Sequence, residues 1–193
     1  NLGFVELNLG NLERATTSLT KAITLGEADG NSYVALGYCH LNLESYLSAE
    51  NAYRMALLLL PESKDARNGL VNCFLYTDRF QQALALLNEL IEKKPEDIFC
   101  HRARAHALQA LGKEKQAAVA LETLKRMGKL ELKDFMLLGD LYHNLNLLDQ
   151  SLVAYNQAIS STQKLPLQSY IRAARILIDR GSFQDGFAYL EKI

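Results

Sequence analysis

The chain has 193 residues, of which 49% are hydrophobic and 22% are charged, a composition typical of a folded globular protein rather than a disordered tail. Its 21 basic and 22 acidic residues leave a net charge of -1, whereas a large nucleic-acid surface needs a basic excess to neutralise phosphates. The apolar run 56–60 is far shorter than the roughly 20 residues that a membrane-spanning helix needs. We therefore expect no nucleic-acid partner and no membrane insertion.

The chain repeats itself with a period of 34 residues, the distance between Pro61 and Pro95. Small residues recur at this period, at Ala15, Ala49, Ala83, Ala117 and Ser151. Four positions later come large residues, at Leu19, Tyr53, Leu87, Leu121 and Tyr155. Three positions further on come Ala22, Ala56, Leu90, Leu124 and Ala158. Because steps of four and three keep residues on one helical face, the pattern predicts a tandem array of helices.

Each period contains two helical stripes separated by a short break. In the second period the first stripe is Tyr33, Leu36, Gly37 and His40, and the second is Tyr46, Ala49, Tyr53 and Ala56. The break falls at 42–45, and Pro61 ends the second stripe because proline disrupts a helix interior. One such pair cannot bury both of its apolar faces, so the pairs must stack into a solenoid. We expect Ala49 and Ala83 to be buried where two helices meet.

These columns resemble the tetratricopeptide repeat family, whose 34-residue unit is a helix-turn-helix. The second period carries the family pattern at Tyr33, Leu36, Gly37, Tyr46, Ala49, Tyr53, Ala56 and Pro61, and the fifth at Phe135, Leu138, Gly139, Tyr142, Ser151, Tyr155 and Ala158. The resemblance implies an all-α, right-handed αα superhelix built as a single array. Its expected units are 1–29 (partial), 30–63, 64–97, 98–131, 132–166 and 167–193 (partial).

Some positions depart from that family pattern. The fourth unit has Arg104 where leucine is usual, Glu114 where an aromatic residue is usual, and Lys129 instead of proline. The sixth unit matches only after a one-residue insertion around Pro166.

The sequence contains no motif for catalysis or for a cofactor. We therefore expect a protein that is not an enzyme and binds no cofactor. Cys100, His101 and His106 cannot converge on one metal ion, because these positions of a helix face different directions. Cys39 and Cys73 occupy equivalent columns of neighbouring units, too far apart for a disulfide, and are expected to be buried as small apolar groups.

In tetratricopeptide arrays the first helix of each unit lines the concave surface, where extended peptides usually lie. The residues just before and just after the Leu-Gly pair are therefore the candidate groove: Phe4, Val34, Tyr38, Asn68, Asn72, Arg102, His106, Met136, Asp140, Ile171 and Arg175. The amides of Asn68 and Asn72 suit a peptide backbone, and Arg102 is expected to select a carboxylate. The alternative is that these positions form an ordinary solvated helix face.

The pattern thus predicts a non-enzymatic adaptor that binds a peptide or protein segment in its concave groove. A carboxylate clamp like that of some family members is not supported, because Val34 and Tyr38 stand where lysine and asparagine would be needed. One alternative is an architectural or self-assembly array within a larger protein. An RNA-binding helical repeat is a distant third, since it would need a basic concave face.

The two ends and the compartment are open at this stage. The chain begins with Asn1 rather than Met, and Phe183, Phe187 and Leu190 leave an apolar stripe near its end, so we expect flanking repeats or self-association through the ends. Unpaired cysteines and the lack of an Asn-x-Ser/Thr sequon favour the cytoplasm, while a bacterial envelope location is compatible with such arrays.

Overall fold

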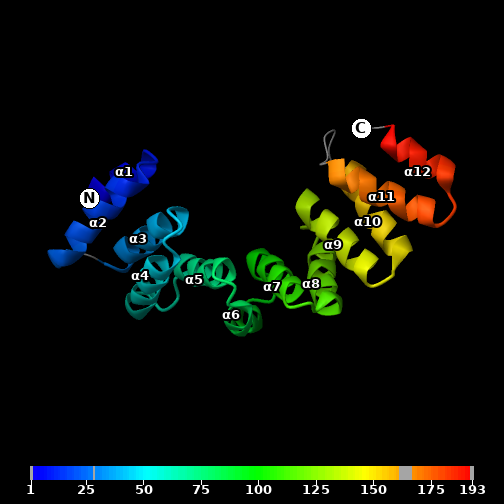
Figure 1. Ribbon diagram of the computed structural model, residues 1–193. Helices are drawn as coiled ribbons and strands as arrows, with labels where there is room; N and C mark the ends of the chain where they lie inside the picture. Colours follow the sequence, from blue (N-terminus) through cyan, green and yellow to red (C-terminus); the bar gives the residue numbers. More distant parts are fainter. Residues whose placement is uncertain (1, 28, 161–166, 192–193) are drawn as a thin grey trace. The chain divides into compact units, whose positions relative to one another are not determined.

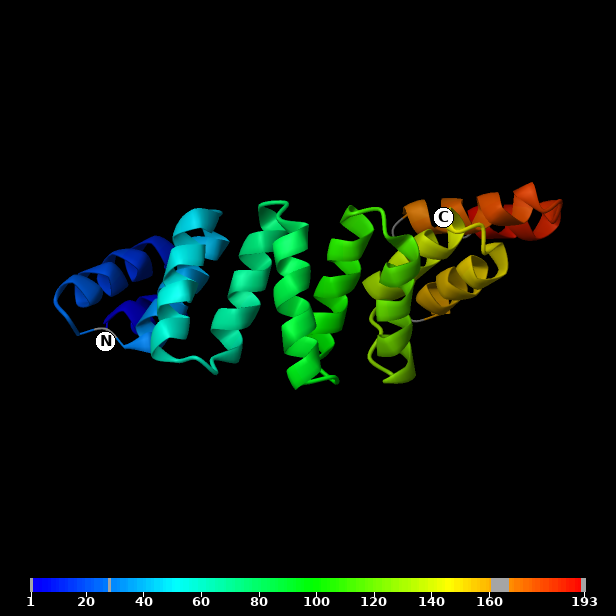
Figure 2. The same ribbon diagram turned by 90° about the horizontal axis from the view of Figure 1, so that it is seen from below.

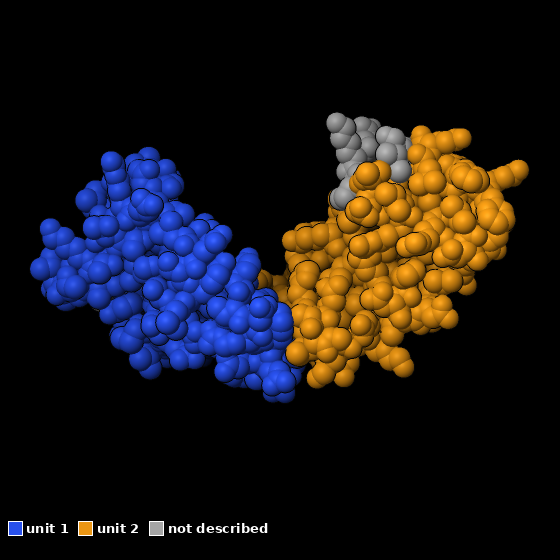
Figure 3. Space-filling view, viewed as in Figure 1, with its two compact units in different colours: residues 1–92 blue, residues 93–193 orange. Residues whose placement is uncertain are grey.

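The computed structural model describes residues 2–27, 29–160 and 167–191, and these residues form α-helices and turns with no strand among them. The chain divides into two compact units, residues 1–92 and 93–193 (Figure 3). Each unit is a row of antiparallel helix pairs (Figure 1). The prediction of an all-α fold of sequential helix pairs is confirmed. The insertion expected around Pro166 lies outside the described residues.

Unit 1 holds the first six helices: α1 (Leu2–Asn8), α2 (Leu12–Thr24), α3 (Gly30–Asn42), α4 (Tyr46–Leu59), α5 (Lys64–Tyr76) and α6 (Phe80–Lys93), the last of which reaches the unit boundary. Helix α4 packs against both α3 and α5, and α3 also packs directly against α5. Since α4 is antiparallel to each of them, α3 and α5 run parallel, and their N-terminal ends lie at the same edge of the unit (Figure 2).

Unit 2 continues the pattern with α7 (Ile98–Ala110), α8 (Glu114–Arg126), α9 (Leu132–Asn144), α10 (Leu148–Ser160), α11 (Leu167–Asp179) and α12 (Phe183–Leu190). Here each helix packs against the next one along the chain, from α7 through to α12. None of the helices in the described ranges is long and apolar enough to cross a membrane.

Capping residues explain where the first helix of a pair begins. The side chain of Asp29 accepts a hydrogen bond from the backbone N–H of Ser32 at 2.9 Å, at the start of α3. One period later, Ser63 caps α5 by accepting from the N–H of Ala66 at 3.3 Å. Such caps satisfy backbone donors that have no partner inside the helix. The turn within each pair also repeats, with a residue of positive φ at Gly10, Glu44, Asp78, Gly112 and Asn146.

The repeated small residues are buried in the core. Ala15, Ala49, Ala83, Ala117 and Ser151 are all 0% exposed, so the predicted burial of Ala49 and Ala83 is confirmed. The ring of Tyr53 on α4 lies against two glycines, Gly37 of α3 and Gly69 of α5. A Cβ atom at Gly69 would come within 2.2 Å of the Tyr53 ring, so this position requires glycine.

A buried ion pair joins α4 to the turn that precedes α6. Glu50 is only 3% exposed. Its carboxylate accepts hydrogen bonds from the guanidinium of Arg79 and forms an ion pair with Arg54 at 2.7 Å. The hydrogen bond from Arg79 lowers the pKa of Glu50, with the charge of Arg54 acting in the same direction. A buried carboxylate is stable only with such partners, so this pair is part of the fold of unit 1.

The three cysteines are buried free thiols, which confirms the burial expected of Cys39 and Cys73. Burial raises the pKa of both thiols, that of Cys73 to about 11. Phe183 and Phe187 of α12 are exposed apolar residues.

Candidate binding groove

Unit 1 contains a groove of about 1170 Å³ that runs over α1, α3 and α5. Five residues of the predicted concave set line it: Phe4, Val34, Tyr38, Asn68 and Asn72. The structure therefore brings together every candidate that the sequence placed in this unit.

Helical geometry explains why these side chains share one surface. Val34 and Tyr38 are four residues apart on α3, and Asn68 and Asn72 stand one period later on the parallel helix α5. Residues four apart on a helix point the same way, so the two helices present matching rows to the groove.

The groove continues one helical turn beyond the predicted residues at both ends. Asn31 and Asp65 extend the two rows toward the N-terminal ends of the helices, and Asn42 and Tyr76 extend them toward the C-terminal ends. The sequence analysis missed these four residues. Their signal was the same 34-residue period together with a helical step, of three residues toward the N-terminal ends and four toward the C-terminal ends.

The middle of the groove offers unused hydrogen-bonding groups. Asn68 and Asn72 are half-buried, and within the described part of the chain neither side-chain amide makes a hydrogen bond to another residue. Each amide carries a donor and an acceptor, the pair of groups that a peptide backbone requires. Tyr53, which is buried between Gly37 and Gly69, forms part of the floor below them.

Exposed aromatic side chains flank these amides. Tyr38 is 50% exposed and Tyr76 is 62% exposed, and the ring of Tyr76 stacks on Tyr46 with 5.4 Å between the ring centroids. Exposed tyrosines supply apolar area at a low cost in side-chain entropy, and they are enriched where proteins bind partners.

The only charged residues among those that line the groove are Asp29 and Asp65. The hydrogen bond from the backbone N–H of Ser32 lowers the pKa of Asp29, and the bond from the Ser32 hydroxyl lowers it further. Asp29 therefore stays ionised in mildly acidic solution. Both aspartates belong to the N-terminal ends of their helices, so the groove is acidic along one edge.

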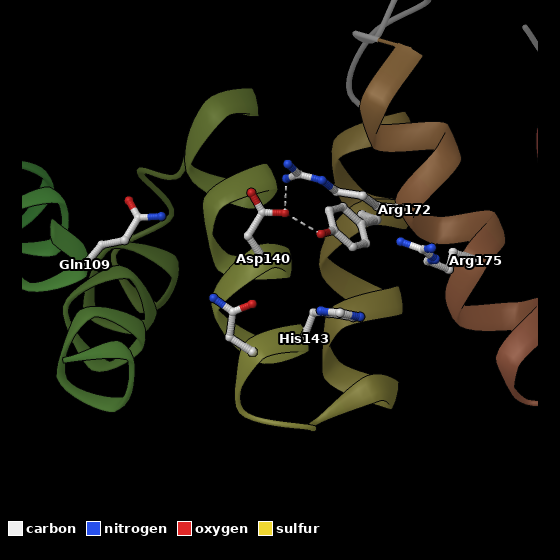
Figure 4. Close-up of a pocket in the computed structure, with 7 residues that line it drawn as sticks. Gln109, Asp140, His143, Arg172 and Arg175 are labelled. Carbon is white, nitrogen blue, oxygen red and sulfur yellow. Dashed lines mark hydrogen bonds and ion pairs between the residues drawn. The ribbon is translucent and has the colours of Figure 1, made fainter. Parts of the chain in front are cut away.

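In unit 2 a smaller pocket of about 360 Å³ contains two more of the predicted residues, Asp140 and Arg175 (Figure 4). The carboxylate of Asp140 accepts hydrogen bonds from Arg172 of α11 and from the hydroxyl of Tyr155. The hydrogen bond to Asp140 raises the pKa of Arg172. Asp140 is thus engaged inside the unit, while Arg175 and His143 are exposed beside it.

The structure gives Arg102 a role different from the predicted one. Its guanidinium forms a two-pronged contact with Asp134, at 2.9 Å from Nε to Oδ1 and 2.8 Å from Nη2 to Oδ2, and an ion pair with Glu131 at 3.0 Å. Asp134 is 1% exposed, and its carboxylate also accepts a hydrogen bond from the backbone N–H of Glu131 at 2.9 Å. Arg102 therefore ties α7 to α9, and the prediction that it selects an acidic ligand loses its basis.

The remaining candidates are dispersed over unit 2. His106 is exposed on α7, Met136 is half-buried on α9, and Ile171 is exposed on α11. None of the three lines the groove or the pocket around Asp140. No group of three His, Cys, Asp or Glu side chains in the described ranges is placed to hold a metal ion.

Models of the tetratricopeptide repeat match the chain at residues 44–112 and again at residues 135–164. The two matches together cover about half of the chain, and the chain belongs to the tetratricopeptide repeat family. Members of this family generally mediate protein–protein interactions and are typically not catalytic.

Solved structures of such proteins share the superhelical fold. PilF of Pseudomonas aeruginosa superposes with a TM-score of 0.79 at 19% identity, over 97% of this chain and 85% of PilF. MamA of Desulfovibrio magneticus RS-1, solved from residue 41 to its end, superposes with a TM-score of 0.76 at 12% identity, over 84% of this chain and 92% of the solved MamA chain. A thermophilic tetratricopeptide repeat protein of Thermus thermophilus superposes with a TM-score of 0.65 at 21% identity, over 92% of this chain and 96% of the Thermus protein. No curated protein matches the sequence.

Proposed function

We propose that the chain is a non-catalytic interaction module that holds an extended segment of a partner protein in the unit 1 groove. The family supports a protein partner in general, since its members bind proteins. The groove supports this particular surface, because it combines apolar area with free amides.

The observation that carries the proposal is the pair of unused amides at Asn68 and Asn72. Buried polar groups normally have a hydrogen-bond partner within the protein. A half-buried amide without such a partner therefore does little to stabilise the fold. Lying on α5 beside the row of Val34 and Tyr38 on α3, the two amides suit the alternating backbone groups of an extended peptide. Recognition through the backbone tolerates different side chains in the bound segment.

The test uses the whole chain, immobilised, and a degenerate library of peptides about ten residues long, each spanning roughly 33 Å when extended. Loss of a backbone hydrogen bond in a half-buried site costs about 1–3 kcal/mol, so Asn72→Ala should weaken retention of the selected peptides roughly tenfold. Gln81→Ala is the matched control, because Gln81 is exposed on α6 and does not line the groove.

Both variants should melt at the temperature of the parent chain, which separates binding from folding. If Asn72→Ala and Gln81→Ala retain peptides equally well, the groove is not the binding surface. An architectural role for the array would then be the better explanation.

A further inference from the structure

We infer that the unit 1 groove selects a segment that carries an arginine or lysine side chain, which lies at the edge formed by Asp29 and Asp65. The inference rests on the proposed function and adds the chemistry of the partner. The charge preference is opposite to the one predicted from the sequence, where Arg102 was expected to select a carboxylate.

The charge of the lining is the first argument. Of the residues that line the groove, Asp29 and Asp65 are charged, and no Lys, Arg or His is among them. The basic residues in the first turn of α5, Lys64 and Arg67, do not line the groove. Arg67 is also occupied, by Glu62 at 2.9 Å and by the carbonyl oxygen of Pro61. A bound carboxylate would meet like charge at this edge, and a bound cation would meet opposite charge.

The position of the two carboxylates is the second argument. Asp29 caps α3 and Asp65 lies in the first turn of α5, and these parallel helices begin at the same edge. Both bonds from Ser32 go to Oδ1 of Asp29. A carboxylate has a second oxygen that can accept a hydrogen bond from a cationic side chain. Its lowered pKa keeps the carboxylate charged.

Apolar side chains at the other end of the groove indicate what the rest of the segment should carry. Asp65 and Tyr76 lie at the two ends of α5, and their separation of eleven residues corresponds to about 16 Å along a helix. An extended peptide covers that distance with about five residues. Leu41 and Tyr76 supply apolar area there. The preferred segment therefore has an apolar residue about five positions from its basic residue.

The experiment selects peptides from a degenerate library about ten residues long on the whole chain, at low and at high salt. The peptide termini are acetylated and amidated, so that only side chains carry charge. We compare the parent chain with Asp29→Asn and Asp65→Asn. Asparagine caps a helix about as well as aspartate, so Asp29→Asn preserves the start of α3. Asp78→Asn is the matched control: Asp78 is an exposed acidic residue of the same unit outside the groove, and asparagine tolerates its positive φ.

We expect arginine or lysine to be enriched at one position of the selected peptides. Each groove variant should lower the affinity for a selected peptide about threefold, and the double variant about tenfold, with smaller effects at high salt. Asp78→Asn should change nothing. Selected peptides that depend on Asn72 but show no basic preference, or an acidic one, would overturn this inference and leave the proposed function standing. If no peptide is retained in an Asn72-dependent way, the proposed function fails and this inference fails with it.

Discussion

The two units place different chemistry on equivalent helical positions. Asn68 of unit 1 is followed one period later by Arg102 of unit 2, and Asn72 is followed two periods later by Asp140. The two asparagine amides are unused, whereas Arg102 is bound by Asp134 and Asp140 is bound by Arg172 and Tyr155. Equivalent positions of the repeat therefore either leave their polar groups unused, as in unit 1, or join helices to one another, as in unit 2. The choice depends on whether the next helix supplies a complementary charge.

The largest expected effect tests the cohesive role of Arg102. Arg102→Met leaves the buried carboxylate of Asp134 without its guanidinium, and breaking such a pair costs about 3–5 kcal/mol. We expect a clear fall in the free energy of unfolding in urea. Peptide retention by unit 1 should be unchanged under conditions in which the chain is folded.

The double variant Arg102→Met with Asp134→Asn serves as the control for that experiment. It should recover part of the lost stability, because no uncompensated charge then remains buried. A single variant as stable as the parent chain but poor in peptide binding would mean that Arg102 is a recognition residue after all.

A second pair of variants compares the glycines beneath the two large tyrosines. A Cβ atom at Gly69 would approach the Tyr53 ring to 2.2 Å, and one at Gly139 would approach the Tyr155 ring to 2.7 Å. Each alanine substitution should cost about 1–3 kcal/mol through overpacking, measured by urea denaturation. Only Gly69→Ala should also weaken peptide retention, since Tyr53 forms the floor of the groove. Equal loss of binding in both variants would contradict the assignment of the groove to unit 1.

The smallest of these effects concerns the pH dependence of stability. Because Arg79 holds the pKa of Glu50 below its ordinary value of 4.5, Glu50 stabilises the fold fully above that value. This contribution disappears as the pH falls through the lowered pKa of the folded state. Urea midpoints measured from about pH 7 to pH 3 should therefore fall less steeply for Glu50→Gln than for the parent chain. If the midpoints of the two chains fall in parallel, Glu50 does not contribute to the pH dependence of stability.

The period of the sequence was sufficient to predict the helix pairs and their core. Residues such as Ala49 and Ala83 recur at fixed spacing, and burial at a helix contact is the common cause of that recurrence. The five groove residues of unit 1 were chosen from the family resemblance, which indicates that the first helix of each unit lines the concave surface, and their spacing then places them on one face of that helix.

The partners of the charged residues could not be read from the columns. Arg102 and Asp134 are 32 residues apart, and their contact depends on how α7 and α9 pack and on the direction of two side chains. The acidic edge was missed for a simpler reason. Asp29 and Asp65 lie outside the two positions per helix that the family pattern indicates, and their common edge follows only from the parallel arrangement of α3 and α5.

The most direct test of the central claim is a titration of the isotope-labelled chain with a peptide selected from the library, followed by the NMR signals of the asparagine side-chain amides and the backbone. The groove account predicts that the amides of Asn68 and Asn72 shift together with backbone signals of α3 and α5. Signals around Asp140 and Arg172 should stay in place. Shifts confined to α9 and α11, with the signals of Asn68 and Asn72 unchanged, would contradict the account.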